Sequence, residues 1–163
     1  MLMNINDYAL NAKVENYPDG LLLEFSDSSY QWASDFGMQR IFQSEKFYWA
    51  ENDVFLGEKF KEAIVAAVND VIYKISFRLY LPDSEKCTDF RVKVFQHLTE
   101  QMGDGYEMQK VNDDTKLIIW ASDEEGNVIL ELSGFDTNII LTSSMIRNAK
   151  KRSFFGSLFG ARN

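Results

Sequence analysis

One cysteine and one histidine limit the chemistry that this chain of 163 residues can perform. A zinc site built from Cys and His, an iron–sulfur cluster and a disulfide framework each need more Cys or His residues, so the composition excludes all three. Cys87 lies just before a predicted helix, a place where thiols can be activated, but we expect it to be unreactive. His97 lies within that helix, and its helical neighbours provide no serine or cysteine nucleophile. We therefore predict that neither residue is catalytic.

Two acidic runs have residue types that bind a hard cation or serve as general acid and base. They are Asp113-Asp114 and Asp123-Glu124-Glu125. Both fall between predicted strands, where solvated turns carry such residues, and neither has the Asp-x-Asp-x-Asp-Gly spacing of a calcium loop. The sequence also has no phosphate-binding glycine loop and no common hydrolase or zinc-protease motif. These observations predict a protein without enzymatic activity, metal or cofactor.

Charge is distributed unevenly along the chain. The sequence has 17 Lys and Arg against 25 Asp and Glu, and its pI is near 4.7. The last acidic residue is Asp136, so the body up to this point carries −13 and the remainder carries +5. Proteins that bind nucleic acids neutralise phosphates with Lys and Arg, which an acidic body does not do. The charge therefore predicts a basic protein partner and no direct binding of nucleic acid.

The C-terminal segment, residues 147–163, combines basic and apolar side chains. Its candidate contact residues are Lys150, Lys151, Arg152, Phe154, Phe155, Leu158 and Phe159. In a helix the four apolar side chains would share one side, although two glycines weaken the helix. This chemistry is typical of segments that rest weakly on anionic lipid and of segments that dock in a protein groove. Three alternatives stay open, which are a frayed or self-docked tail, contact with a protein partner, and contact with a membrane.

Aromatic residues are dense between Tyr30 and Trp49, where the hydrophobic pattern has no clear period. Most of the 13 Phe, 7 Tyr and 3 Trp must form core, but aromatic side chains on an acidic surface are typical interface anchors. We therefore expect some of these aromatics, with the acidic run at 123–125, to contact the partner. The candidate partner-binding residues are Trp32, Phe36, Tyr48, Trp49, Asp123, Glu124 and Glu125.

Hydrophobic periodicity and turn residues predict the elements that would position these side chains. In the first half we expect a hairpin of residues 12–17 and 21–25 around Pro18-Asp19-Gly20, short strands at 38–43 and 46–50, a helix over 58–73 and a strand over 75–81. In the second half we expect a helix over 89–102, capped by Thr88 or Ser84, then strands at 106–111, 116–122, 127–133 and 138–143. Five side chains, Leu117, Ile119, Val128, Leu130 and Leu132, are expected to face the core.

These elements predict an α+β fold, in which an N-terminal hairpin and a C-terminal four-strand antiparallel meander pack against two amphipathic helices. We expect one domain over residues 1–146 and a basic, aromatic tail over 147–163. The N-terminus has no basic segment followed by an apolar run, and no apolar stretch reaches membrane-spanning length. The expected location is therefore cytoplasmic, with peripheral membrane contact through the tail as the alternative.

An acidic, non-catalytic protein of this size fits an inhibitor that blocks a basic partner. The most concrete form is a bacterial immunity protein, because toxins that cleave nucleic acid present a basic cleft that an acidic face can occlude. The first alternative is a secretion chaperone or adaptor, which holds an extended client segment on an apolar groove. A membrane-peripheral regulator acting through the tail and a nucleic-acid mimic are further alternatives. A monomer with one folded partner would favour the inhibitor, and a dimer with an extended client would favour the chaperone.

Overall fold

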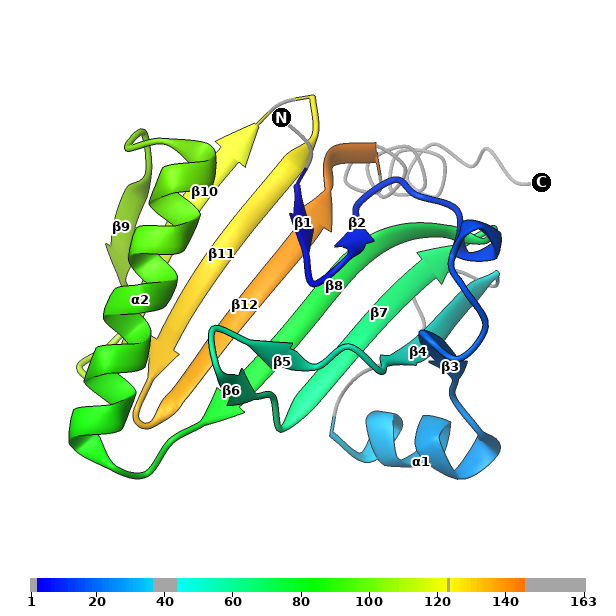
Figure 1. Ribbon diagram of the computed structural model, residues 1–163, viewed down its shortest axis with the longest axis horizontal. Coiled ribbons are helices and arrows are strands. Elements are labelled where there is room, and N and C mark those ends of the chain that lie inside the picture. The colour runs from blue at the N-terminus through cyan, green and yellow to red at the C-terminus, as the bar shows by residue number, and fades with distance from the viewer. Residues whose placement is uncertain (1–2, 37–43, 123, 146–163) are drawn as a thin grey trace, which may run out of the picture.

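Eight antiparallel strands form the main sheet of the computed structural model, which describes residues 3–36, 44–122 and 124–145. The order across the sheet is β3-β4-β7-β8-β12-β11-β10-β9 (Figure 1). The bounds are β3 (Leu22–Glu24), β4 (Glu45–Ala50), β7 (Glu62–Val68), β8 (Val71–Tyr80), β9 (Glu107–Lys110), β10 (Thr115–Ser122), β11 (Gly126–Ser133) and β12 (Asp136–Ser143). Two small hairpins lie outside this sheet, β1 (Asn4–Ile5) with β2 (Tyr8–Ala9) and β5 (Val54–Phe55) with β6 (Glu58–Lys59), and a short 3-10 helix spans Val14–Asn16.

One face of the sheet carries the main hydrophobic core. Helix α2 (Ser84–Met102) and both small hairpins lie in front of this face in Figure 1, and their apolar side chains join those of the sheet in one buried cluster. On the opposite face, helix α1 (Asp27–Asp35) packs near β3, β4 and β7 over a second cluster that includes Phe25, Phe47 and Tyr73. Among the described residues, no element covers the part of this opposite face formed by β10, β11 and β12.

Helix α2 has clear sequence reasons for its bounds and its orientation. The Asp83 carboxylate caps the first turn by accepting a hydrogen bond from the backbone N–H of Lys86, at 2.9 Å. Phe90, Val94 and Leu98 recur at intervals of four and are all buried against the sheet. The helix predicted over 89–102 is therefore confirmed, but it begins five residues earlier, and its cap is Asp83 instead of Thr88 or Ser84.

The helix predicted over 58–73 is wrong. Residues 62–68 and 71–80 are instead strands β7 and β8, which pair antiparallel around Asn69-Asp70 with a register shift between Ala66 and Ala67. Asn69 and Asp70 both have positive φ, 51° and 64°, as the tight two-residue turn of a β-hairpin requires. The centre of β7 is buried on both faces, so its apolar residues form a continuous run instead of an alternating pattern. Such a run can be mistaken for the apolar stripe of a helix.

The hairpin predicted over residues 12–25 is only partly correct. The turn exists, because the N–H of Leu21 donates to the carbonyl of Pro18 at 3.2 Å and Gly20 has a φ of 88°. However, β3 pairs with β4, and the N-terminal hairpin of the fold is formed by β1 and β2. The expected strand at 46–50 is confirmed as β4, and the expected strand at 38–43 lies outside the described residues.

The antiparallel meander and the α+β class are confirmed. In one strand of the meander, β10, the face that packs on the core is the opposite of the predicted one. In β10 it is Ile118 and Trp120 that point into the core, whereas Leu117 and Ile119 lie on the opposite face. The indole N–H of Trp120 donates to the carbonyl of Gly103 at 3.0 Å, which holds this strand face against the end of α2. Apolar residues occupy both faces of β10, so alternation alone could not decide its orientation.

Candidate functional site

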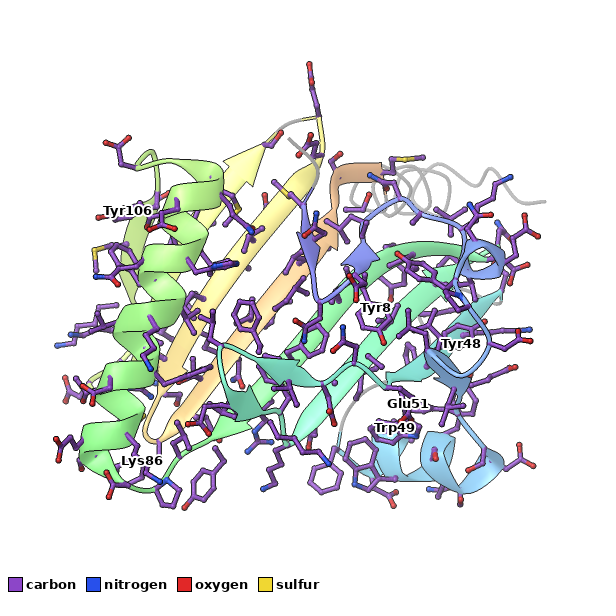
Figure 2. All side chains as sticks on the ribbon, in the orientation of Figure 1. Tyr8, Tyr48, Trp49, Glu51, Lys86 and Tyr106 are labelled. Atoms are coloured by element: carbon purple, nitrogen blue, oxygen red, sulfur yellow. The ribbon has the colours of Figure 1, made fainter. Side chains whose placement is uncertain are left out.

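The structure brings together three of the four predicted aromatic anchors. Trp32 on α1 lies 5.6 Å from Trp49 on β4 and 5.2 Å from Phe36, measured between ring centroids. Phe36 is the most exposed of the three, at 71%, while both tryptophans are half-buried. Tyr48 points to the other face of the sheet and is buried in the main core at 7% exposure. Figure 2 labels Tyr48 and the neighbouring Trp49 on this part of the sheet.

The acidic run at 123–125 is far from these aromatics. Glu124 and Glu125 lie in the turn between β10 and β11, and Asp123 is outside the described residues. Four strands separate β4 from β10 in the sheet, which corresponds to roughly 24 Å at the usual strand spacing. A single small contact surface therefore does not contain both groups. The tail contact residues Lys150 to Phe159 also lie outside the described residues.

The side chains of His97 and Cys87 contact other residues of the fold. The imidazole of His97 meets the ring of Phe55 edge-on at 5.2 Å, and its Nε2 lies 3.1 Å from Nε2 of Gln101. The Cys87 side chain is buried, with Sγ 3.9 Å from the carbonyl oxygen of Phe135. Within the described residues, no three His, Cys, Asp or Glu side chains are arranged to hold a metal ion.

The strongest candidate site is an open apolar groove between α2 and the outer strands β9, β10 and β11. Its volume is about 460 Å³. The residues that line it are Thr88, Arg91, Val92, Phe95, Gln96, Met108, Ile118, Leu130 and Leu132. Ile118 and Leu130 belong to the core and form the floor, whereas Val92 and Met108 are 50% and 63% exposed on opposite walls. The groove thus presents apolar side chains to solvent on the helix and on the edge strand.

Fixed contacts hold both walls of the groove in place. The Phe95 ring packs edge-on against Tyr106 at 5.2 Å and lies 6.1 Å from Trp120. Tyr106 lies beside the C-terminal half of α2 in Figure 2. Arg91 ties α2 to the turn between β11 and β12, because its guanidinium donates to the carbonyls of Gly134 and Asp136 at 2.7 and 2.8 Å. The groove therefore exists before a ligand binds, which reduces the entropic cost of binding.

Strand β9 forms the outer wall of the groove and the edge of the sheet. All four of its residues are exposed. The N–H of Val111 donates to the carbonyl of Thr115 on β10. In an antiparallel ladder every second residue of a strand forms hydrogen bonds with a given neighbouring strand, so Gln109 and Glu107 also face β10 with their backbone groups. The backbone groups of Met108 and Lys110 consequently point to the outer edge, where an additional strand could pair with them. The edge offers hydrogen bonds and the groove offers apolar burial.

Acidic side chains flank β9 at both ends. Asp104 is exposed at the end near the C-terminus of α2, which has no basic residue in its last turn, and Glu107, the first residue of β9, is exposed on the sheet face opposite the groove. Asp113 and Asp114 are exposed at the other end, where Asp113 pairs with Lys110 at 3.4 Å. The C-terminus of a helix carries partial negative charge, which adds to the acidity around Asp104. A ligand with basic residues near this end would be favoured.

The sequence contains only weak signals of this groove. Val92 is an apolar residue off the buried stripe of α2, and Met108 is the one apolar residue of β9. Each is unremarkable alone, because single exposed apolar residues are common on protein surfaces. Only the packing of α2 beside β9 makes them opposite walls of one groove.

No family model matches the chain, and no similar protein was found among curated sequences or among solved structures. In the part of the chain that the structure describes, neither helix is long and apolar enough to cross a bilayer.

Proposed function

We propose that this protein is a non-catalytic binding protein that holds an extended segment of another protein in the groove between α2 and β9. The observation that carries the proposal is the preformed apolar groove, about 460 Å³ in volume, one wall of which is β9, the edge strand of the sheet within the described residues. Extended segments gain affinity from backbone pairing at a sheet edge and specificity from side chains in adjacent pockets. This is the mode of binding expected of a chaperone or adaptor, the first alternative drawn from the sequence.

The ligand segment has an apolar centre and basic residues at the end that meets Asp104 and the C-terminus of α2. An apolar side chain would enter between Val92 and Met108, where it would replace water on already exposed hydrophobic surface. Basic residues would meet the acidic flank of β9 and the C-terminus of α2. The net charge of −8 predicts a basic partner, and in this proposal that partner binds at the groove. A cytoplasmic location remains part of the proposal.

A second copy of this chain fits the β9 edge less well than a basic ligand segment does. Antiparallel pairing of two β9 strands would bring Asp113 and Asp114 of one copy next to the segment around Asp104 of the other. Like charges placed opposite each other across paired strands are destabilising. The charge at both ends of β9 therefore favours a heterologous, basic ligand.

The proposal is tested with peptides of about twelve residues that share one apolar centre and carry basic, neutral or acidic flanks. We expect fluorescence anisotropy to show binding of the basic-flanked peptide and weaker binding of the acidic-flanked one. Val92→Asp places a charge in the groove wall. We expect this substitution to lower the affinity for the basic-flanked peptide at least about tenfold. Val54→Asp is the matched control, because Val54 is exposed to the same degree, at 53%, but lies on β5.

Equal affinity of the two variants would contradict the groove as the binding site. A preference for acidic flanks would contradict the assigned ligand chemistry. Circular dichroism and thermal unfolding of both variants establish that a loss of binding does not come from a loss of fold.

An immunity-type inhibitor is the second candidate, and the acidic end of α2 favours it. Glu100, Asp104, Glu107 and Glu124 are all exposed in this part of the surface. An acidic surface steers a basic partner electrostatically, so association would slow strongly with added salt. Light scattering of the isolated complex distinguishes the inhibitor from the chaperone. One folded partner bound to a monomer would favour the inhibitor, and a client segment bound to a dimer would favour the chaperone.

A further inference from the structure

Strand β9, the outermost arrow beside α2 in Figure 1, presents different side chains on its two faces. Met108 lies in register with Ile118 of β10, which forms the groove floor, so Met108 and Lys110 point to the groove side of the sheet. Glu107 and Gln109 point to the opposite side, where the Gln109 amide donates to the Glu107 carboxylate at 3.3 Å. A strand added to β9 would therefore meet a different set of side chains on each of its own faces.

The register also decides which positions of an added strand would lie closest to β9. The backbone groups of Glu107 and Gln109 pair with β10. Those of Met108 and Lys110 point outward and would form the hydrogen bonds with the added strand. The residue opposite Glu107 would then belong to a non-hydrogen-bonded pair, in which the Cα atoms approach to about 4.5 Å. Side chains interact most closely in such pairs, so Glu107 is well placed to select the residue opposite it.

Opposite charges occupy the two ends of β9. Glu107 lies at the end near Asp104 and the C-terminus of α2. Lys110 lies at the other end, directly opposite Lys116 of β10 and on the same side of the sheet. Two like charges in this arrangement repel each other, so a carboxylate placed beside them would be stabilising. Asp113 lies 3.4 Å from Lys110, but its side chain is 99% exposed, so this ion pair is weak and can be exchanged.

Antiparallel pairing converts these positions into a sequence order. Within the described residues, all neighbouring strands of the main sheet pair antiparallel. A strand that adds to β9 in the same way runs from the Lys110 end to the Glu107 end. Complementary residues opposite Lys110, Met108 and Glu107 are then acidic, apolar and basic, in that order along the added strand.

We propose that the β9 edge selects an extended segment with the order acidic, polar, apolar, basic from its N-terminus to its C-terminus, and that Glu107 and Lys110 determine this order. The inference rests on the proposed function, because it requires an extended segment that pairs with β9. The apolar residue of the segment lies beside Met108 at the groove, and the polar residue lies opposite Gln109. The basic residue lies opposite Glu107, and the segment then continues toward Asp104.

Two peptides of equal composition test the order. The first carries glutamate, threonine, leucine and lysine at its four central positions, and in the second these four residues are reversed. We expect fluorescence anisotropy with the full chain to show that the first peptide binds at least about fivefold more tightly, because only this peptide places both charges opposite their complements. Equal affinities, or tighter binding of the reversed peptide, would overturn the proposed order.

Charge exchange tests the two residues that determine the order. Glu107→Lys is expected to lower the affinity for the first peptide about fivefold, and a peptide with glutamate in place of its lysine should restore the loss. Lys110→Glu, with lysine in place of the peptide's glutamate, is the corresponding exchange at the other end. Glu100→Lys is the matched control, because it changes the net charge equally at an exposed site on α2 near the same end. An equal loss in Glu100→Lys, or no restoration by the exchanged peptides, would contradict direct pairing.

Val92→Asp distinguishes a failure of this inference from a failure of the proposed function. If Val92→Asp loses both peptides while the wild type binds them equally, the groove is the binding site and the proposed order is wrong. If Val92→Asp binds both peptides as the wild type does, the proposed function itself fails. Thermal unfolding of each variant establishes that a loss of affinity does not come from a loss of fold.

Discussion

Replacing Gly126 with alanine is expected to lower the free energy of unfolding by about 3 kcal/mol. Gly126 has a φ of 133°, a conformation that residues with a Cβ rarely adopt. A Cβ at this position would also overlap the carbonyl oxygen of Thr142 on the neighbouring strand β12. Because the overlapping atom belongs to the backbone, relief requires a shift of the paired strands. For a chain of this size the loss corresponds to a decrease in Tm of roughly 6–12 °C, measured by thermal unfolding.

Gly134→Ala is the matched control for this prediction. Gly134 also has a positive φ, 56°, but no atom lies within 4 Å of the position of a new Cβ. We expect a loss of about 1 kcal/mol, which reflects the backbone conformation alone. Similar losses for the two variants would show that the close approach of β11 and β12 at Gly126 is not a constraint.

Tyr73→Phe is expected to cost about 2 kcal/mol of unfolding free energy, because it leaves a buried carboxylate without one of its donors. The Tyr73 hydroxyl donates to Oε1 of Glu45, and Glu45 is 1% exposed. Urea unfolding of Tyr73→Phe, Glu45→Gln and the double variant forms a thermodynamic cycle that isolates the interaction. If the change in unfolding free energy of the double variant equals the sum of the changes of the two single variants, the two side chains are not directly coupled.

Alkaline pH is expected to destabilise the protein through the same tyrosine. Burial, with the hydrogen bond to Glu45 as the second cause, raises the pKa of Tyr73 far above its ordinary 10.0. The unfolded chain loses this proton near pH 10 while the native protein retains it, so stability is complete below pH 10 and falls as the pH rises beyond it. The slope is about 1.4 kcal/mol per pH unit for each such group. Burial also raises the pKa of Tyr8 and of Tyr48, which adds to the effect.

Urea unfolding between pH 9 and 11 measures this dependence. Tyr73→Phe should show a slope smaller by one proton than the wild type above pH 10, since it removes one of the groups. An unchanged slope would show that Tyr73 ionises normally in the folded protein.

Local sequence signals located the helix and the strands of the second half, although not the orientation of β10, and they were insufficient for the first half. The stripe of Phe90, Val94 and Leu98 predicts α2 correctly, and turn residues separate the strands of the meander. In the first half, β7 is buried on both faces, so its sequence lacks the alternation that distinguishes a strand. Strand β3 pairs with β4, about two dozen residues later, and no local pattern specifies such a distant partner.

The candidate groove was harder to predict than the fold. Its walls come from α2 and β9, and each contributes a single exposed apolar residue, Val92 or Met108. The sequence indicates which residues are apolar, but the gap between a helix and an edge strand depends on how the two pack. The predicted aromatic anchors Trp32, Trp49 and Phe36 do cluster, and whether they contact a partner is still a prediction.

Strand β12 pairs with β8 and thereby joins the two halves of the sheet, although 55 positions separate the end of β8 from the start of β12. During synthesis the first half, from β3 to β8, is made without this neighbour, so β8 emerges as an unpaired edge with buried-type residues such as Ile75 and Phe77. The nascent chain therefore exposes a strand that can pair wrongly until Ser143 has left the ribosome. Molecular chaperones that cover extended apolar segments would be expected to act in this interval.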